Sequence, residues 1–259
     1  CVHWKGVCIF QEYVWRGERI ASPREIDDAG IVRKAKVSSN TYLLRLGVGA
    51  EMARKLNMPG SYIFIREKGK PSIFDAPMSV MDADENEGTV DILLQRRGSK
   101  TKFAEGGGKD VCVRGPYYNG IMGLKYLKML KGGGCIIAAR GIAQSPAVMV
   151  AKKLRSLGSE VTVLLDPGRS RTDFSKSYFE QLGCDVRKTV LLDGARMSGD
   201  ASALLTQAIG ERNAALIFSG GSDLLHKSIL KLKDEIDRNI MFFCTNNARI
   251  CCGEGVCGS

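Results

Sequence analysis

The stretch KGGGCIIAARGIAQSPAVMVAKKLRSLG, residues 131–158, contains the change of pattern that decides the fold. After its KGGG linker, the apolar run Cys135–Ala139 is typical of a strand buried on both faces, and Gly141 follows that run. The next piece begins like a helix, with Ser145 at the N-cap and Pro146 at the first helical position, and it ends on a glycine. A strand, a glycine turn and a helix in this order predict the first βα unit of a parallel sheet.

The segments downstream continue this alternation of short buried strands and amphipathic helices. Strands flanked by helices of this length predict a Rossmann-like parallel α/β sheet over residues 131–243, with helices on both faces. The segments are Val161–Leu165, Asp173–Leu182, Thr189–Leu192, Ala203–Ile209, Ala215–Ser219, Leu224–Ile236 and Ile240–Cys244.

Residues 31–125 have a different rhythm, in which short alternating segments are separated by Gly, Asn, Asp and Pro. Six such strands, with one helical turn before Pro59, predict a small antiparallel β-barrel. Residues 1–30 are interpreted as a cysteine-containing N-terminal extension. The predicted strands are Val32–Val37, Thr41–Leu46, Ser61–Ile65, Pro77–Met81, Val90–Gln95 and Asp110–Val113.

The composition is that of an ordinary globular protein, with 44% hydrophobic and 25% charged residues in a chain of 259. No apolar stretch is long enough to cross a bilayer and no signal-peptide pattern opens the sequence, so we expect a cytoplasmic protein without a membrane partner. The net charge is +10, and the scattered basic residues favour solvated faces over a nucleic-acid groove. The densest basic stretches contain Arg96, Arg97, Lys100 and Lys102, and then Lys125, Lys128 and Lys131.

Most of the nine cysteines lie near the two ends of the sequence. An odd total without a secretory signal argues against a disulfide framework, and the clustering of cysteines at the ends favours metal binding. Cys1 and Cys8, with His3 between them, are either part of a further metal motif or two plain thiols. The other histidine, His226, is expected at the surface or the edge of the core, so no hydrolytic constellation is predicted. The sequence begins on Cys and stops within a Cys/Gly motif, so we expect it to be part of a longer protein.

Three segments of the predicted barrel have features of a cofactor site. In Ala76–Asp84 a strand presents Ser79 and backbone amides beside a proline. In Asp91–Phe103 a strand runs into the turn Gly98–Thr101, whose lysine, hydroxyl groups and backbone N–H groups suit a pyrophosphate. Val113–Gly123 contains a tight turn of the kind that ends a barrel. Taken singly, each segment is also consistent with a plain β-turn.

Taken in order, these segments resemble the electron-transfer subunit of dihydroorotate dehydrogenase, in the ferredoxin-reductase-like superfamily, from about residue 31 to the end. In that family a strand with Arg-Pro-x-Ser lies against the flavin diphosphate, and Ala76 stands at the arginine position here. The spacing to the following strand and turn fits without gaps, and Gly115–Gly120 also looks like the family's. The resemblance implies an FAD site, with FMN as the alternative cofactor. Its residues are Pro77, Met78, Ser79, Val80, Leu93, Leu94, Gln95, Gly98, Ser99, Lys100 and Thr101.

The resemblance also implies a site for NAD(P)H at the ends of the parallel strands. A dinucleotide needs glycines after the first strand, because the backbone must approach the pyrophosphate. Gly141 is retained here, whereas Arg140 stands where the family has a glycine. Gly220 lies in the later segment, in which Ser219 replaces the family's cysteine near the nicotinamide. These changes leave two interpretations open, NAD(P)H oxidation and a retained fold with weakened nucleotide binding.

The terminal segment ICCGEGVCGS, residues 250–259, has the spacing of an iron–sulfur ligand loop. Cys252 and Cys257 form the first half of a C-x4-C-x2-C motif, which is typical of plant-type [2Fe–2S] sites. Cys251 is the alternative first ligand, although its spacing to Cys257 is one residue too long. The family has this loop in the corresponding place, so we assign Cys252 and Cys257 as metal ligands and residues 244–259 as the start of the loop.

The function that the resemblance implies is electron transfer between NAD(P)H, FAD and a [2Fe–2S] cluster, with a catalytic oxidoreductase subunit or a ferredoxin as the partner. Such a chain is expected to act as an FAD-dependent NAD(P)H oxidoreductase within a hetero-oligomer, where the cofactors supply the chemistry. The alternative is a non-catalytic docking subunit with a degenerate reductase fold, which the residues Ala76 and Ser219 favour.

Overall fold

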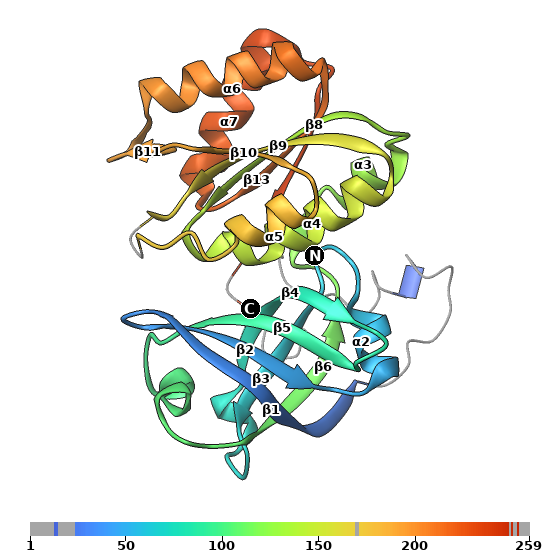
Figure 1. Cartoon of the computed structure of the whole chain (residues 1–259), viewed down its shortest axis with the longest axis vertical. Helices are drawn as coiled ribbons and strands as arrows, with labels where there is room; N and C mark the ends of the chain where they lie inside the picture. Colours follow the sequence, from blue (N-terminus) through green and yellow to red (C-terminus); the bar gives the residue numbers. More distant parts are fainter. Residues whose placement is uncertain (1–12, 15–23, 169–170, 249, 251–252, 254–259) are drawn as a thin grey trace.

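The computed structural model describes residues 13–14, 24–168, 171–248, 250 and 253. They form two layers, an antiparallel β-barrel and a sheet covered by helices, which Figure 1 shows one below the other. This arrangement confirms the predicted fold class. No helix among these residues is long and apolar enough to span a membrane.

Six strands close the barrel in the order β1-β2-β5-β4-β3-β6, and every neighbouring pair is antiparallel. Alternate apolar side chains such as Ile63, Ile65 and Ile92 fill its interior. Helix α2 (Ala50–Leu56) adds Leu56 to this core. The strands are β1 (Glu25–Ser38), β2 (Thr41–Gly47), β3 (Tyr62–Glu67), β4 (Ala76–Asp84), β5 (Thr89–Gln95) and β6 (Asp110–Tyr117).

Strand β1 begins at Glu25, which lies before the predicted start of the barrel at Ile31. Its first part pairs with β6 and the rest pairs with β2. Only Ala29 of this first part is buried, so the alternation that marks a strand in a sequence is missing. The barrel therefore includes residues that the sequence pattern assigns to the N-terminal extension, because backbone pairing places them there.

The upper layer is a six-stranded sheet in the order β10-β9-β8-β13-β14-β7. Its neighbouring strands are parallel except for β7, which is antiparallel to β14, so the sheet is mixed rather than fully parallel as predicted. The strands are β7 (Ile121–Met122), β8 (Gly133–Arg140), β9 (Ser159–Asp166), β10 (Asp185–Lys188), β13 (Ala214–Gly220) and β14 (Met241–Thr245). A separate pair consists of β11 (Leu192–Asp193) and β12 (Arg196–Met197).

Helices cover both faces of this sheet, as predicted. They are α3 (Leu124–Met129), α4 (Gln144–Ser156), α5 (Lys176–Gln181), α6 (Gly199–Arg212) and α7 (Asp223–Ile236). Consecutive residues of β8 point to opposite faces, so Ile137 lies in one apolar cluster with residues of α4 and α5, and Ile136 lies in another with residues of α6 and α7.

Two local predictions near the start of the sheet are wrong. Helix α4 begins at Gln144, so Ser145 lies within its first turn, and the N-cap residue Ala143 has no side-chain hydrogen bond. Gly134 of the predicted linker is part of β8. A Cβ at Gly134 would lie 2.0 Å from the carbonyl oxygen of Arg212, so this glycine allows a close approach of two backbones.

The predicted strand Thr189–Leu192 is also wrong, because the outer strand of the sheet is β10, at Asp185–Lys188. Strand β10 lies at the edge and is rich in charged residues, which is common at sheet edges and hides the strand from a search for apolar alternation. The apolar residue Leu191 is buried in the cluster beneath α6 and α7 without belonging to the sheet.

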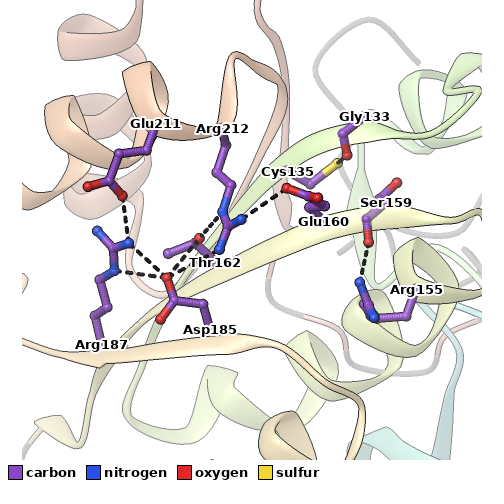
Figure 2. Close-up of polar contacts among 10 residues, drawn as sticks. All are labelled: Gly133, Cys135, Arg155, Ser159, Glu160, Thr162, Asp185, Arg187, Glu211 and Arg212. Atoms are coloured by element: carbon purple, nitrogen blue, oxygen red, sulfur yellow. Dashed lines mark hydrogen bonds and ion pairs between the residues drawn. The ribbon is translucent and has the colours of Figure 1, made fainter.

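Charged side chains join the beginnings of β9 and β10 to the end of α6 (Figure 2). Arg187 contacts Asp185 at 2.8 Å and Glu211 at 2.6 Å, and Arg212 contacts Glu160 at 3.0 Å. Burial raises the pKa of Asp185, but Arg187, the hydrogen bond of Thr162 and the charge of Arg212 together more than offset it, so the pKa lies below its ordinary value. Ligands of such sheets bind at the carboxyl ends of the strands, so this network stabilises the opposite end.

The barrel and the sheet meet where α4 lies against β4. Met149 of α4 is buried in the apolar cluster of the barrel, and Met81 of β4 is buried in the cluster on the α4 side of the sheet. Lys152 of α4 also pairs with Asp82 of β4 at 2.6 Å. The two layers therefore share one packed junction.

Candidate functional site

Strand β4 divides the predicted flavin residues between its two faces. Pro77 is exposed and Ser79 is half-buried, and both lie opposite aromatic residues of β3. Met78 packs against the apolar cluster of the barrel, and Val80 belongs to that cluster. Of these four residues, only Pro77 and Ser79 therefore face the outside of the barrel. A cofactor bound along β4 would lie on that outer side.

Strand β5 places its predicted residues mainly in the interior. Leu94 is fully buried in the barrel cluster, and Leu93 lies opposite Leu43, which packs against the cluster of the sheet. Gln95 is half-buried at the end of the strand, where its side chain accepts a hydrogen bond of 2.7 Å from Arg97. Leu93 and Leu94 hold the strand in place, and Gln95 is the one with an accessible polar group.

An aromatic cluster covers the outer face of the barrel beside β4. Tyr62 and Tyr117 are stacked with their ring centroids 5.1 Å apart, and Phe64 meets Tyr117 edge-on at 5.2 Å. The guanidinium group of Arg114 lies 4.4 Å from the centroid of Phe64. Because Tyr62 and Phe64 lie opposite Ser79 and Pro77, the aromatic cluster and the predicted flavin residues of β4 share one face.

Two described residues of the C-terminal segment, Ile250 and Gly253, lie on this aromatic cluster. Ile250 packs against it, and a Cβ at Gly253 would lie 2.5 Å from an edge carbon of the Phe64 ring. Gly253 has a φ of +75°, so its close approach and its backbone conformation both require glycine. Two described residues of the predicted iron–sulfur segment are thus placed on the barrel, one strand away from β4.

The predicted ligands Cys252 and Cys257, the alternative Cys251, and the pair Cys1 and Cys8 all lie outside the described residues. Within the residues that the structure describes, no three His, Cys, Asp or Glu side chains are grouped as metal ligands. The metal assignment therefore stays a prediction.

A buried carboxylate anchors the beginning of β4. Asp75 pairs with Arg66 at 2.7 Å and with Arg114 at 3.0 Å, and the side chain of Asp75 is 3% exposed. The backbone carbonyl of Asp75 accepts a hydrogen bond of 3.1 Å from Lys100. The turn at Gly98–Thr101 and the start of β4, both predicted to bind the diphosphate, are therefore joined at Asp75.

The turn itself opens into the short 3-10 helix η2 (Ser99–Glu105). Thr101 is buried and accepts a hydrogen bond of 3.0 Å from the backbone of Arg97, so it holds the turn together. Ser99 is exposed, and no atom lies within 4 Å of a Cβ placed on Gly98, so the open side of the turn is free of packing.

A cleft of about 630 Å³ lies beside this turn. Its volume is within the range of small-molecule sites, and it combines cations and a hydroxyl with two aromatic rings. Those groups suit the phosphates and the base of a nucleotide, so the residues at this end of the site fit FAD. They are Phe74, Phe103, Ser99, Lys70, Lys100 and Lys102, together with Glu67, Glu105, Gly106, Gly107, Gly108 and Asp110.

The two predicted nucleotide glycines lie at the carboxyl ends of neighbouring strands. Gly141 follows β8 with a φ of +58°, and Gly220 ends β13, which pairs with β8. A Cβ at Gly220 would lie 3.0 Å from the carbonyl oxygen of Ala143, so the two turns approach closely. The chain passes from β8 to α4 on one face of the sheet and from β13 to α7 on the other face. The ligand-binding crevice of doubly wound folds lies at such a point.

Most polar groups around these glycines are already bonded within the protein, whereas the buried hydroxyl of Ser145 has no hydrogen-bond partner among the described residues. Arg140 pairs with Asp166 at 2.8 Å, and the same carboxylate accepts hydrogen bonds from the backbone of Gly168 and of Leu191. The buried side chain of Gln144 donates to the carbonyl of Asp166 at 3.3 Å. Arg140 therefore has an internal anionic partner that a nucleotide phosphate would have to replace.

Ser219, at the position of the family's cysteine, is fully buried and lies 2.7 Å from Nδ1 of His226. The other ring nitrogen of His226 lies 3.2 Å from the hydroxyl of Thr245. Burial lowers the pKa of His226 below its ordinary value, although the charge of Asp223 acts in the opposite direction. His226, expected at the surface or the core edge, is a buried partner of Ser219.

Comparison with known proteins supports a single architecture. No family model matches the sequence. The electron transfer subunit of dihydroorotate dehydrogenase B (NAD(+)) from Shouchella clausii (strain KSM-K16) is 24% identical over 232 residues, which cover 88% of this chain and 84% of that protein. The corresponding subunit from Bacillus mycoides (strain KBAB4) is 24% identical over 163 residues, and there the match spans 61% of the relative.

Solved structures share the fold at low identity. A structure of NADH-dependent reduced ferredoxin-NADP oxidoreductase gives a TM-score of 0.70 at 17% identity and covers 89% of this chain and 80% of its own. The ferredoxin reductase in carbazole 1,9a-dioxygenase gives 0.62 at 16% identity, with 86% and 70% covered. These findings confirm the resemblance stated from the sequence, and they show the ferredoxin-reductase-like fold.

Proposed function

We propose that this chain is a flavin-binding electron-transfer subunit that carries electrons between NAD(P)H, FAD and a [2Fe–2S] cluster. One observation carries the proposal. Ile250 of the predicted cluster loop packs on the aromatic cluster, and Gly253 lies against Phe64, which pairs with Pro77 of β4. Strand β4 and the residues Ile250 and Gly253 are far apart in the sequence, but only strand β3 separates them in the fold. Electron transfer requires such short separations.

In this proposal the flavin lies along the outer face of β4, with its diphosphate at the turn Gly98–Thr101. Lys100 and Ser99 bind the phosphates, while Pro77, Ser79 and Gln95 contact the flavin. The family has an arginine at the position of Ala76. Arg66 and Arg114 are bound to Asp75, so neither takes the place of that arginine. Bound FAD would accept a hydride and release single electrons.

The cleft favours FAD over FMN. FMN ends at one phosphate, whereas FAD extends to an adenosine group that needs further space. Phe74 and Phe103 line the cleft next to Lys100 and offer aromatic surfaces for such a base.

NAD(P)H is assigned to the crevice at Gly141 and Gly220, where the missing side chains let a pyrophosphate approach the backbone. Arg140 would exchange Asp166 for a phosphate oxygen. Cys252 and Cys257 are proposed as the first two cluster ligands. A catalytic oxidoreductase subunit or a ferredoxin is the proposed partner, and the 24% identical dihydroorotate dehydrogenase B subunits support a hetero-oligomer.

The test is anaerobic purification of the full-length gene product, followed by assays of flavin, iron and sulfide. We expect bound FAD that NADH or NADPH bleaches. Lys100→Ala should weaken FAD binding about 10- to 100-fold, the effect of removing a charge-assisted hydrogen bond. Lys36→Ala is the control, because Lys36 is an exposed lysine of β1 that does not line the cleft. Protein that neither contains nor takes up flavin would refute the proposal.

A second candidate is a non-catalytic docking subunit. The observation that favours it is that Arg140 pairs with Asp166 and Ser219 bonds to His226. Both side chains therefore have partners without a nucleotide. A folded, colourless protein that binds its partner subunit would support this candidate.

A further inference from the structure

We propose that a surface formed by β7 and α3 docks an acidic partner protein that exchanges electrons with this chain. The surface, called here the β7–α3 surface, consists of Met122, Lys125, Lys128, Met129 and Lys131. The inference rests on the proposed electron-transfer function and adds to it a docking position and the charge of the partner.

The first observation is a charge asymmetry in the sequence. Residues 111–159 contain eight Lys and Arg residues and no Asp or Glu. Three of these cations have acidic partners elsewhere in the fold, since Arg114, Arg140 and Lys152 pair with carboxylates. The charge of the β7–α3 surface is therefore not balanced from within its own segment.

The lysines of the β7–α3 surface are not part of such pairs. Lys125, Lys128 and Lys131 are exposed, and none forms an ion pair with another described residue. The amino group of Lys125 lies 4.9 Å from the ring centroid of Tyr126, which leaves its charge near the surface. Three exposed positive charges within seven residues attract an acidic protein over a long range.

Two exposed methionines lie on the same segment as these charges. Met122 is 47% exposed and Met129 is 65% exposed, whereas Leu127 and Leu130 on the other side of α3 are buried in the core of the sheet. Methionine is enriched in protein interfaces, and its flexible side chain adapts to a partner surface. An apolar centre with a charged rim is the usual arrangement of a docking surface.

The third observation is position. Strand β7 is the edge of the sheet, and its Met122 pairs with Cys244 of β14. Strand β14 leads directly into the C-terminal segment, where the backbone of Asn246 bonds to the carbonyl of Gly120 at 2.9 Å. Figure 1 shows α3 at the side of the sheet layer, close to the barrel. A partner seated here would border Asn246, at the start of the C-terminal segment.

The test compares two charge-reversal variants of the full-length protein. The first is Lys125→Glu, Lys128→Glu and Lys131→Glu together. The matched control is Lys227→Glu, Lys231→Glu and Arg238→Glu, which changes the charge equally on exposed positions of and just after α7, on the opposite face of the sheet. Thermal melts of both variants check that the fold is intact.

The probes are a reduced, acidic [2Fe–2S] ferredoxin and reduced methyl viologen, each mixed anaerobically with oxidised protein. Two one-electron donors are oxidised for each flavin reduced, and solvent supplies the protons. At low salt, we expect the first variant to slow reduction by ferredoxin about tenfold and to flatten its salt dependence, while the α7 variant stays within about twofold. Methyl viologen, which needs no docking, should reduce all three proteins equally.

Failure of this inference differs from failure of the proposed function. If flavin is present and methyl viologen reduces it, but both variants respond alike to ferredoxin, the docking surface is wrong and the function stands. If flavin is absent, binding of ferredoxin is measured by calorimetry, and equal affinity in the wild type and the first variant overturns the inference. Selective loss of duplex DNA binding in that variant, with ferredoxin binding unchanged, would assign the surface to nucleic acid and also overturn it.

Discussion

The barrel and the sheet use the polar groups of their candidate sites in opposite ways. In the barrel, Ser99 and Lys100 line an open cleft, and the buried anchor Asp75 lies behind them. In the sheet, Arg140 already pairs with Asp166 at the glycine turn. A cofactor would add contacts to the barrel, whereas a dinucleotide would have to replace contacts in the sheet.

This difference fits a resident cofactor in one layer and a transient one in the other. A phosphate that replaces Asp166 as the partner of Arg140 gains little net free energy. The phosphate must lose its own water, and the new ion pair takes the place of an existing one. The barrel cleft requires no such exchange at Ser99. We therefore expect flavin to bind more tightly than NAD(P)H.

The largest effect is expected from Asp75→Ala. This change leaves two guanidinium groups, whose side chains are 14% and 12% exposed, without their carboxylate. Breaking a buried ion pair from one side typically costs about 3–5 kcal/mol. Urea unfolding should show a loss of this size, with flavin affinity reduced as the start of β4 loosens.

Asp166→Ala is the counterpart in the sheet. It removes the carboxylate that pairs with Arg140, whose side chain is more exposed than those of Arg66 and Arg114. It also removes the acceptor of two backbone N–H groups. We expect a smaller loss, about 1–3 kcal/mol, because water can reach Arg140. If Asp166→Ala destabilised the protein more than Asp75→Ala, the contrast between the two layers would have to be reversed.

Much of the fold follows from local sequence patterns. Strand β2 alternates buried and half-buried positions, β5 and β9 are almost continuously buried runs, and α7 buries Leu225, Ile229 and Lys233 at helical spacing, so their places are predictable. The first part of β1, the edge strand β10 and the antiparallel β7 are held by backbone pairing with distant strands, which leaves no local pattern.

The candidate site divides in the same way. The turns at Gly98 and Gly141 are visible in the sequence, because glycine marks positions where the backbone must be accessible. The pairing of Asp75 with Arg114 and of Ser219 with His226 is not visible, since each bond depends on how the elements pack. The sequence gives the type and position of each polar residue, but it does not give the residue to which that side chain bonds.

The next prediction concerns pH and tests the sheet alone. An unfolded histidine binds a proton near pH 6.5, whereas burial lowers the pKa of His226 in the folded protein. As pH falls below about 6.5, the unfolded state binds more protons than the folded state, so stability is lost; above that pH the contribution is constant. The slope for one such group approaches about 1.4 kcal/mol per pH unit.

His226→Asn removes this titrating group while its amide keeps a polar atom near Ser219. Unfolding free energies measured between pH 7 and pH 5 should show a shallower acid slope than in the wild type. Ser219→Ala keeps the imidazole and serves as the control, so its slope should stay steep. Equal slopes in the wild type and His226→Asn would mean that His226 is protonated in the folded protein at these pH values.

The smallest effect is expected at the junction between the two layers, from Lys152→Met. The ion pair with Asp82 is partly exposed, with side chains 36% and 33% accessible, so its loss should cost at most about 1 kcal/mol. Met149→Ala is the comparison, because Met149 is buried in the barrel cluster and its truncation should cost about 2–5 kcal/mol. Urea unfolding at low and high salt measures both, and only the Lys152 effect should shrink with salt. An effect of Lys152→Met as large as that of Met149→Ala would mean that charge, rather than apolar packing, holds the barrel against the sheet.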